Sequence, residues 1–171
     1  MLGAEPGRKL WQGLFWENQN KFNNLSGIVE IMVKISYGLD HNPDAKVVRQ
    51  AVFVEEQGFQ HEFDEIDGRA WHVVLYEDGI PVATGRTFPK GDGGVYLIGR
   101  VAVQKAYRGK GLGEKVVREL EKKLKELGAN RAELSAQLQA QGFYEKMGYL
   151  PYGDVYHDEH CPHIAMGKDL A

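Results

Sequence analysis

Residues 106–120 read AYRGKGLGEKVVREL, and this stretch joins an apolar, strand-like run to an amphipathic helical pattern. Gly109, Gly111 and Gly113 alternate in it, and Arg108 and Lys110 lie among them. The first N–H groups of a helix have no partners within the helix and bear partial positive charge, so they bind phosphate groups. Glycine lets the backbone approach such an anion closely. The stretch therefore predicts a phosphate-binding helix N-terminus, and a tight turn that is merely rich in glycine is the plainer alternative.

Two common phosphate motifs do not fit this stretch. A P-loop needs a Lys-Ser/Thr pair after its last glycine, but Glu114 follows Gly113 here. The dinucleotide fingerprint needs G-x-G-x-x-G in a parallel βαβ unit, whereas the spacing here is G-x-G-x-G and hairpin strands precede it. The pattern that remains is Arg-x-x-Gly-x-Gly, from Arg108 to Gly113.

This pattern resembles the pyrophosphate loop of the GNAT superfamily of N-acetyltransferases. A second stretch, QLQAQGFYEKMGY at residues 137–149, resembles the other cofactor signature of that superfamily, with Ala140, Phe143, Tyr144 and Gly148 in place. Gln137 stands where that signature usually has Asn. Together with AVFVEEQGF and CPHIAMGKDL, these stretches resemble the ElaA-like branch of small bacterial acetyltransferases, over residues 32–171.

The resemblance implies that acetyl-CoA is the co-substrate and that an amine is the acceptor, either a small molecule or a peptide. It also implies a sheet that splays open after the strand at residues 95–103, with pantetheine along that strand and the pyrophosphate on the glycine loop. The cofactor-binding residues that it implies are Val101, Ala102, Val103, Arg108, Gly109, Lys110, Gly111, Leu112, Gly113, Ser135, Gln137 and Tyr144.

The remaining periodicities predict an α/β (α+β) fold with a mixed, mostly antiparallel sheet and flanking helices. Apolar residues recur at helical spacing over 43–58, 111–127 and 138–147. Alternating or β-rich runs predict strands at 32–39, at 71–89 as a hairpin, and at 95–103, 131–136, 149–153 and 163–170. One βαβ crossover is expected at the centre, around the glycine stretch.

The N-terminal residues 1–31 are interpreted as an extension outside a domain that spans 32–171. The extension has an Asn-rich polar stretch immediately before the strand that is expected to start at Met32. It lacks the long apolar core and the cleavage site of a secretory signal. A short amphipathic helix that docks through Trp11, Phe15 and Trp16 is the alternative.

Composition limits the classes of partner and the compartment. The chain has 171 residues and a formal net charge of -3, without the basic surplus that nucleic-acid binding favours. It has one cysteine, Cys161, so no intrachain disulfide can form and a reducing, cytoplasmic setting is expected. No apolar run is long enough to cross a bilayer. A monomer and a homodimer both remain open.

Acetyl transfer to an amine needs a base for the amine, a donor for the developing oxyanion and an acid for the leaving thiolate. By resemblance Tyr144 is the acid and a backbone N–H near Val101 or Val103 is the donor; a packing role for Tyr144 is the alternative. Some relatives have a Glu base on the central strand, where this chain has Arg100. The base candidates are Glu56 and His72 first, with Glu55, His163 or a water relay as alternatives.

No metal site is predicted. His157, His160 and His163 are spaced three apart around Cys161, but Pro162 and the loop setting argue against a fixed site. Direct transfer also needs no cysteine nucleophile. The acidic run at residues 62–67 is interpreted as a solvated loop, with attraction of a cationic acceptor as the alternative.

Two alternative functions stay open. Arg49, Phe53, Asp64, Asp67 and Arg86 also resemble the first half of acyl-homoserine-lactone synthases, which share the fold but lack the Arg-x-x-Gly-x-Gly loop that is intact here. A non-catalytic module that binds CoA or a partner is the other alternative.

Overall fold

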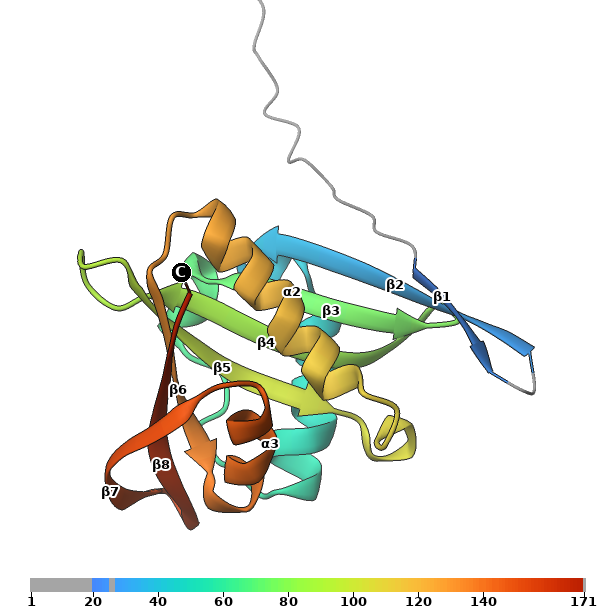
Figure 1. The fold of residues 1–171 in the computed structure, drawn as a ribbon. Coiled ribbons are helices and arrows are strands. Elements are labelled where there is room, and N and C mark those ends of the chain that lie inside the picture. Colours follow the sequence, from blue (N-terminus) through green and yellow to red (C-terminus); the bar gives the residue numbers. More distant parts are fainter. Residues whose placement is uncertain (1–19, 25–26, 171) are drawn as a thin grey trace, which may run out of the picture.

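The computed structural model describes residues 20–24 and 27–170, which form one sheet of eight strands in the order β1-β2-β3-β4-β5-β6-β8-β7 (Figure 1). All neighbouring strands are antiparallel except β5 and β6, which are parallel. The predicted mixed, mostly antiparallel sheet is therefore confirmed. The strands are β1 (Asn20–Asn24), β2 (Gly27–Tyr37), β3 (Trp71–Glu77), β4 (Ile80–Pro89), β5 (Val95–Val103), β6 (Arg131–Gln137), β7 (Leu150–Asp158) and β8 (Cys161–Asp169).

Helices cover both faces of this sheet. The long helix α2 crosses one face, and α1 and its continuation lie on the other (Figure 1). The α-helices are α1 (Asp44–Arg49), α2 (Leu112–Glu126) and α3 (Gln141–Lys146). The other helical segments are the π-helix η2 (Gln50–Glu56) and the 3₁₀ segments η1 (Leu39–His41), η3 (Glu65–Arg69), η4 (Lys105–Tyr107) and η5 (Leu138–Ala140).

The apolar stripe of α2 determines how the central crossover packs. Val116, Val117, Leu120 and Leu124 are fully buried against the sheet, as their helical spacing predicts. Because β5, α2 and β6 form the one parallel crossover, the N-terminus of α2 lies beside the carboxyl end of β5. The glycine stretch is thereby placed at the centre of the sheet.

The sheet opens between β5 and β6. The two strands pair only from Val95 and Arg131 to Ile98 and Leu134, although β5 continues to Val103 and β6 to Gln137. The predicted splay is therefore present in the structure. Backbone groups beyond the last pair have no partner across this gap, and they leave space for an extended ligand.

A β-bulge in β5 lies at the start of the splay. Thr84 pairs with Ala102 while Arg86 pairs with Gly99, so one extra residue is inserted in β5. Arg100 takes up the insertion in the left-handed region, with φ of 53°. As a result Val101 and Val103 contact the same core under α2 as Ile98 does, instead of alternating with it.

The N-terminal boundary of the first predicted strand is wrong by five residues. β2 begins at Gly27 rather than Met32, and residues 20–24 pair with its first part as a hairpin. Ile31 is buried in the core, and the Glu30 carbonyl accepts a hydrogen bond from the Asp78 N–H at 3.1 Å. Residues 1–19 lie outside the described residues, so the docking helix at Trp11 to Trp16 and the extension itself stay predictions.

Two local structures differ from the expected ones. The helix predicted over 43–58 widens into a π-helix from Gln50, where the Gln57 N–H bonds the Val52 carbonyl five residues back. The acidic run expected as a solvated loop contains the 3₁₀ segment η3, which Asp64 and Asp67 cap reciprocally. In the described part of the chain no helix combines the length and apolar character needed to span a membrane.

Candidate active site

A cavity of about 550 Å³ lies in the splay between β5 and β6. Some of its lining residues belong to the core under α2, among them Val101, Val103 and Tyr144. Others belong to the cluster on the opposite face of the sheet, among them Phe53 and Phe59. The cavity therefore connects the two faces, and ligands approaching from opposite sides can meet inside it.

The glycine loop lies at one end of this cavity, which Arg108 and Gly113 line. Gly109 and Gly111 have φ of 79° and 77°, values that favour glycine, and a Cβ on either would meet no atom within 4 Å. Among the described residues, the first N–H that bonds back into α2 is that of Lys115, to the Gly111 carbonyl at 3.1 Å. Within the described part of the chain, the N–H groups of residues 109–114 have no protein partner, so they fit an anion such as a pyrophosphate.

Gly113 serves packing. A Cβ there would lie 3.4 Å from the Phe143 ring and 3.7 Å from the Val103 side chain. Both are ordinary van der Waals distances, so Gly113 lies where the first turn of α2 packs against α3.

The two basic side chains of the loop are both engaged with carboxylates. The Arg108 guanidinium donates to both oxygens of Glu56 at 2.7 Å, and its Nε donates to the Val103 carbonyl at 2.9 Å. Lys110 donates to Glu77 at 2.7 Å. Arg108 lines the cavity, while Lys110 and Glu56 do not.

The predicted base Glu56 is thus an ion-pair partner in this structure. Its hydrogen bonds from Arg108 lower the pKa of the Glu56 carboxyl. A lowered pKa makes the carboxylate a weaker proton acceptor. A role as base, which was the expectation from sequence, is therefore not supported by its surroundings.

The predicted base His72 lies away from the cavity. It is fully buried on β3, and its Nε2 lies 2.9 Å from the Asp67 carbonyl. Burial lowers the pKa of His72. It shares a strand face with Val74 and Tyr76, and α1 and η3 cover that face, so the ring supports the loop instead of reaching a substrate.

Tyr144, the candidate acid, is one of the residues that line the cavity. It is 8 % exposed, and its ring meets those of Phe143 and Tyr149 edge to face. Burial raises the pKa of Tyr144 to about 12. The hydroxyl is therefore protonated at neutral pH and can donate to a leaving group.

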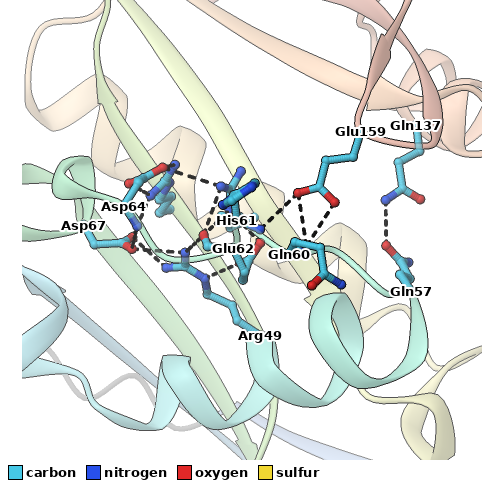
Figure 2. Close-up of polar contacts among 11 residues, drawn as sticks. Arg49, Gln57, Gln60, His61, Glu62, Asp64, Asp67, Gln137 and Glu159 are labelled. Carbon is cyan, nitrogen blue, oxygen red and sulfur yellow. Dashed lines mark hydrogen bonds and ion pairs between the residues drawn. The ribbon is translucent and has the colours of Figure 1, made fainter.

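Ser135 and Gln137 line the cavity from β6. Gln137 donates to Gln57 at the end of η2 at 2.7 Å (Figure 2), and Ser135 forms a short hydrogen bond with the Tyr156 hydroxyl. Both contacts lie on the face opposite α2, because the alternate residues of β6 are buried under α2. They tie β6 to neighbouring elements, and contact of either residue with the cofactor stays a prediction.

A buried ion-pair network supports the loop beside the cavity, and the sequence interpretation missed it. Arg49 is 1 % exposed, and it contacts Glu62 and Asp67 at 2.6 Å each (Figure 2). Arg86 contacts Asp67 at 2.6 Å and Asp64 at 2.7 Å. The acidic run is therefore neutralised within the protein instead of being solvated.

The bulge residue Arg100 joins this network. Its Nη2 donates to the Glu62 carbonyl at 3.0 Å, and its Nε lies 3.1 Å from the Glu62 carboxylate. Burial raises the pKa of Glu62, although Arg100 and Arg49 oppose that shift. The bulge of β5 and the loop at 62–67 are thus held together by three arginines and three carboxylates. The sequence signal that could have revealed this network is the resemblance to lactone synthases. Four of the six residues belong to it: Arg49, Asp64, Asp67 and Arg86.

The turn between β7 and β8 closes the far side of the cavity. The Glu159 carboxylate accepts hydrogen bonds from the N–H groups of Gln60 and His61 at 3.0 Å (Figure 2).

Over residues 20–24 and 27–170, no three His, Cys, Asp or Glu side chains gather into a possible metal site. Cys161 is buried as a free thiol.

The chain is similar to other proteins along most of its length. A family model described as the acetyltransferase (GNAT) family matches residues 40–149. The uncharacterised N-acetyltransferase YjcF of Bacillus subtilis is 37 % identical over 129 residues, which are 74 % of this chain and 91 % of that protein. Protein ElaA of Escherichia coli is 30 % identical over 128 residues, which are 72 % of this chain and 84 % of that protein.

Solved structures agree with this assignment. The crystal structure of Escherichia coli ElaA has a TM-score of 0.72 and 26 % identity, over 81 % of this chain and 99 % of that one. A CoA-dependent acyl-homoserine lactone synthase, BjaI, solved with SAM and isopentyl-CoA, has a TM-score of 0.68 over 80 % of this chain and 82 % of that one. At 14 % identity this second likeness shows the fold alone.

Proposed function

Because the chain belongs to the GNAT acetyltransferase family, we propose that it transfers an acetyl group from acetyl-CoA to an amine by direct attack in a ternary complex. The observation that supports this most is the cavity in the splay, which connects the two faces of the sheet. A thioester placed between β5 and β6 would be open to an amine from the opposite face. Direct transfer needs that geometry, and it needs no covalent enzyme intermediate.

The cofactor would lie along residues that the structure already places together. The N–H groups of Gly109 to Gly113 would bind the pyrophosphate, and the backbone of Val101 to Val103 would pair with pantetheine. When bound, acetyl-CoA supplies the thioester carbonyl that an amine can attack. The open space at Gly111 and the missing partner of β5 beyond Ile98 both fit such a ligand.

The chain's own groups provide two of the three chemical needs. Backbone N–H groups of β5 beyond the splay can donate to the developing oxyanion, since β6 no longer pairs with them. Tyr144 can donate its proton to the leaving sulfur, because its hydroxyl stays protonated at neutral pH. The apolar part of the cavity lining, which includes Phe53 and Phe143, can pack against the acyl group.

The acceptor is proposed to be a small-molecule or peptide amine in the cytoplasm. A net charge of -3 gives no support to a nucleic-acid partner. A single buried cysteine fits a reducing compartment. The protein is proposed to act as a monomer or a homodimer.

A screen of primary amines with acetyl-CoA tests this function, with release of free CoA thiol as the readout. We expect thiol release that depends on both acetyl-CoA and one class of amine. A no-acceptor reaction measures hydrolysis. Tight acetyl-CoA binding without turnover on any amine would instead identify a CoA-binding module.

A lactone synthase is the second candidate, because one observation favours it. The buried network uses Arg49, Asp64, Asp67 and Arg86, the residues whose pattern resembles those enzymes. The intact glycine loop favours the acetyltransferase instead. Formation of an acyl-homoserine lactone from S-adenosylmethionine and an acyl-CoA would decide for the synthase.

A further inference from the structure

His163 lies on β8 and lines the cavity from the face opposite Tyr144. It is 6 % exposed, and strand alternation turns it to the side of Cys161, which belongs to the cluster beneath η2. Tyr144 belongs to the core under α2. A thioester in the splay would therefore have Tyr144 on the cofactor side and His163 on the acceptor side.

The hydrogen bonds of His163 define which nitrogen can accept a proton. Its Nδ1 lies 2.9 Å from the Cys161 carbonyl. A carbonyl oxygen only accepts, so Nδ1 is the atom that bears hydrogen. In the neutral ring the lone pair is then on Nε2, and within the described residues Nε2 has no hydrogen-bond partner.

The ring is also held in place by its neighbours. Tyr156 stacks on it with ring centroids 6.1 Å apart and planes 24° from parallel, and the Tyr156 hydroxyl bonds Ser135 on β6. In the strand ladder His163 lies between Gln137 and Tyr156. An acceptor with a fixed orientation and a fixed tautomer is what general-base catalysis requires.

The other candidates from the sequence lack this combination. Glu56 is paired with Arg108 outside the cavity lining, and His72 is enclosed on another face. Glu62 reaches the cavity, but Arg49 and Arg100 hold its carboxylate. His61, Asp158 and Glu159 also line the cavity, but all three are exposed, and His61 is the rival imidazole.

We propose that His163 is the general base of the acyl transfer, and this rests on the proposed function. Its Nε2 takes one proton from the attacking amine as the N–C bond forms at the acyl carbon. The C–S bond breaks, its electron pair goes to sulfur, and the Tyr144 hydroxyl gives the thiolate a proton. Exchange with solvent then returns the imidazolium and the tyrosinate to their starting states, so atoms and charges balance.

Other titratable or charged groups share the surroundings of His163 and shape the pH dependence. Arg100 lies on β5, and Tyr144 projects from α3 on the cofactor side. The remaining groups lie on the neighbouring loop, on β7, on the turn that follows it and on β8: His61, Glu62, Tyr156, Asp158, Glu159 and Cys161.

The test compares His163→Asn with His157→Asn in the amine screen. Asn keeps a donor near the Nδ1 position, so the bond to the Cys161 carbonyl can persist while Nε2 is lost. We expect kcat to fall by about 10²- to 10⁴-fold with unchanged acetyl-CoA affinity. We also expect the acid limb of the kcat/KM profile to vanish, which a structural role would not cause. His157 is exposed on β7 outside the cavity lining, so His157→Asn should match the wild type.

Two further measurements keep the proposal decidable. His163→Gln serves if the Asn variant fails to fold, and ¹⁵N chemical shifts of the wild-type imidazole report the tautomer without turnover. An Nε2–H tautomer, or a wild-type rate and pH profile in a folded variant, overturns the assignment to His163. Loss of the acid limb in His61→Asn alone assigns the base to His61 instead. A wild type that acylates no amine overturns the proposed function, and this proposal with it.

Discussion

Arg108 and Glu56, 52 residues apart in the sequence, form a two-point ion pair with both N–O distances at 2.7 Å. The sequence interpretation gave these residues separate tasks, cofactor binding and proton abstraction. In the structure the Arg108 guanidinium and the Glu56 carboxylate bind each other. Because the same guanidinium also bonds the Val103 carbonyl, the pair holds the end of β5 and the end of η2 together.

Replacing Glu56 with Gln separates these roles. We expect kcat to stay near the wild-type value, and the affinity for acetyl-CoA to change less than about fivefold, because partly exposed ion pairs contribute at most about 1 kcal/mol. Steady-state kinetics with calorimetric binding measure both quantities. A loss of kcat of about 10²-fold together with the acid limb would identify Glu56 as the base after all.

Gly111→Asp should weaken acetyl-CoA binding without unfolding the protein. The carboxylate would enter the space open to the pyrophosphate, and φ of 77° adds strain. We expect the dissociation constant of acetyl-CoA to rise more than about tenfold, or 1.4 kcal/mol. Gly128→Asp is the matched control, because Gly128 has φ of 75° and open space at the other end of α2. Equal calorimetric affinity in the two variants would contradict the phosphate-loop interpretation.

Tyr144→Phe should lower kcat by about 10²- to 10⁴-fold while acetyl-CoA affinity stays constant. The variant keeps the ring contacts with Phe143 and Tyr149 and loses only the hydroxyl. Since the pKa of Tyr144 is raised to about 12, its deprotonation should cause no fall in the wild-type rate below about pH 11. Rates of the two proteins across pH 6 to 10, by thiol release, provide the check. Equal rates would make Tyr144 a packing residue.

Asp67→Asn should destabilise the fold by about 3–5 kcal/mol, because Arg49 and Arg86 lose a buried partner. Urea unfolding at pH 7 measures this. Glu126→Gln is the control, since Glu126 is exposed and its loss should cost less than about 0.5 kcal/mol.

The same residue gives a pH dependence. Burial alone would raise the pKa of Asp67. The hydrogen bonds and the positive charge of Arg49, together with hydrogen bonds from the Asp64 N–H and from Arg86, instead lower this pKa from the ordinary 3.8 to about 2. The stabilisation is therefore complete above 3.8 and is lost as the pH falls through about 2. Wild-type stability should fall across this window more steeply than that of Asp67→Asn. Parallel curves would show that Asp67 does not cause the loss.

A chain that starts at Met32 should be less stable than one that starts at Gly27. The shorter chain lacks the buried Ile31, whose removal we compare with a buried Ile→Ala change of about 2–5 kcal/mol. Thermal unfolding of both proteins gives the difference. Equal stability would restore Met32 as the start of the domain.

The sequence predicts well where local pattern and tertiary packing agree. Val116, Leu120 and Leu124 lie on one apolar helical stripe, so the helix α2 was predictable. The glycines before it suit a phosphate-binding helix N-terminus, so the loop was predictable as well. The face of His72 was also predictable from strand alternation. Whether that face borders the cavity depends on α1 and η3, whose position no local pattern gives.

Two of the features that were missed depend on distant partners, and the third, the start of β2, depends on a local hairpin. The positive φ of Arg100 has no local signal, because the residue that adopts it is not glycine and its side chain is held by Glu62, 38 residues away. The ion pair of Glu56 with Arg108 is equally nonlocal. The β2 start was missed because the Asn-rich stretch before it looked like a linker, although the strand pairs with it.

The bulge at Arg100 makes the length of β5 matter more than its composition. The single extra residue turns Val101 and Val103 to the same face as Ile98. A one-residue deletion between Gly99 and Val103 would remove the bulge and leave a regular ladder with β4. The side chain of every later residue of β5 would then lie on the opposite face of the sheet. Deletions are therefore the damaging changes in this strand. An alignment of homologues that places a gap there would assign Val101 to Val103 to the wrong faces of the sheet.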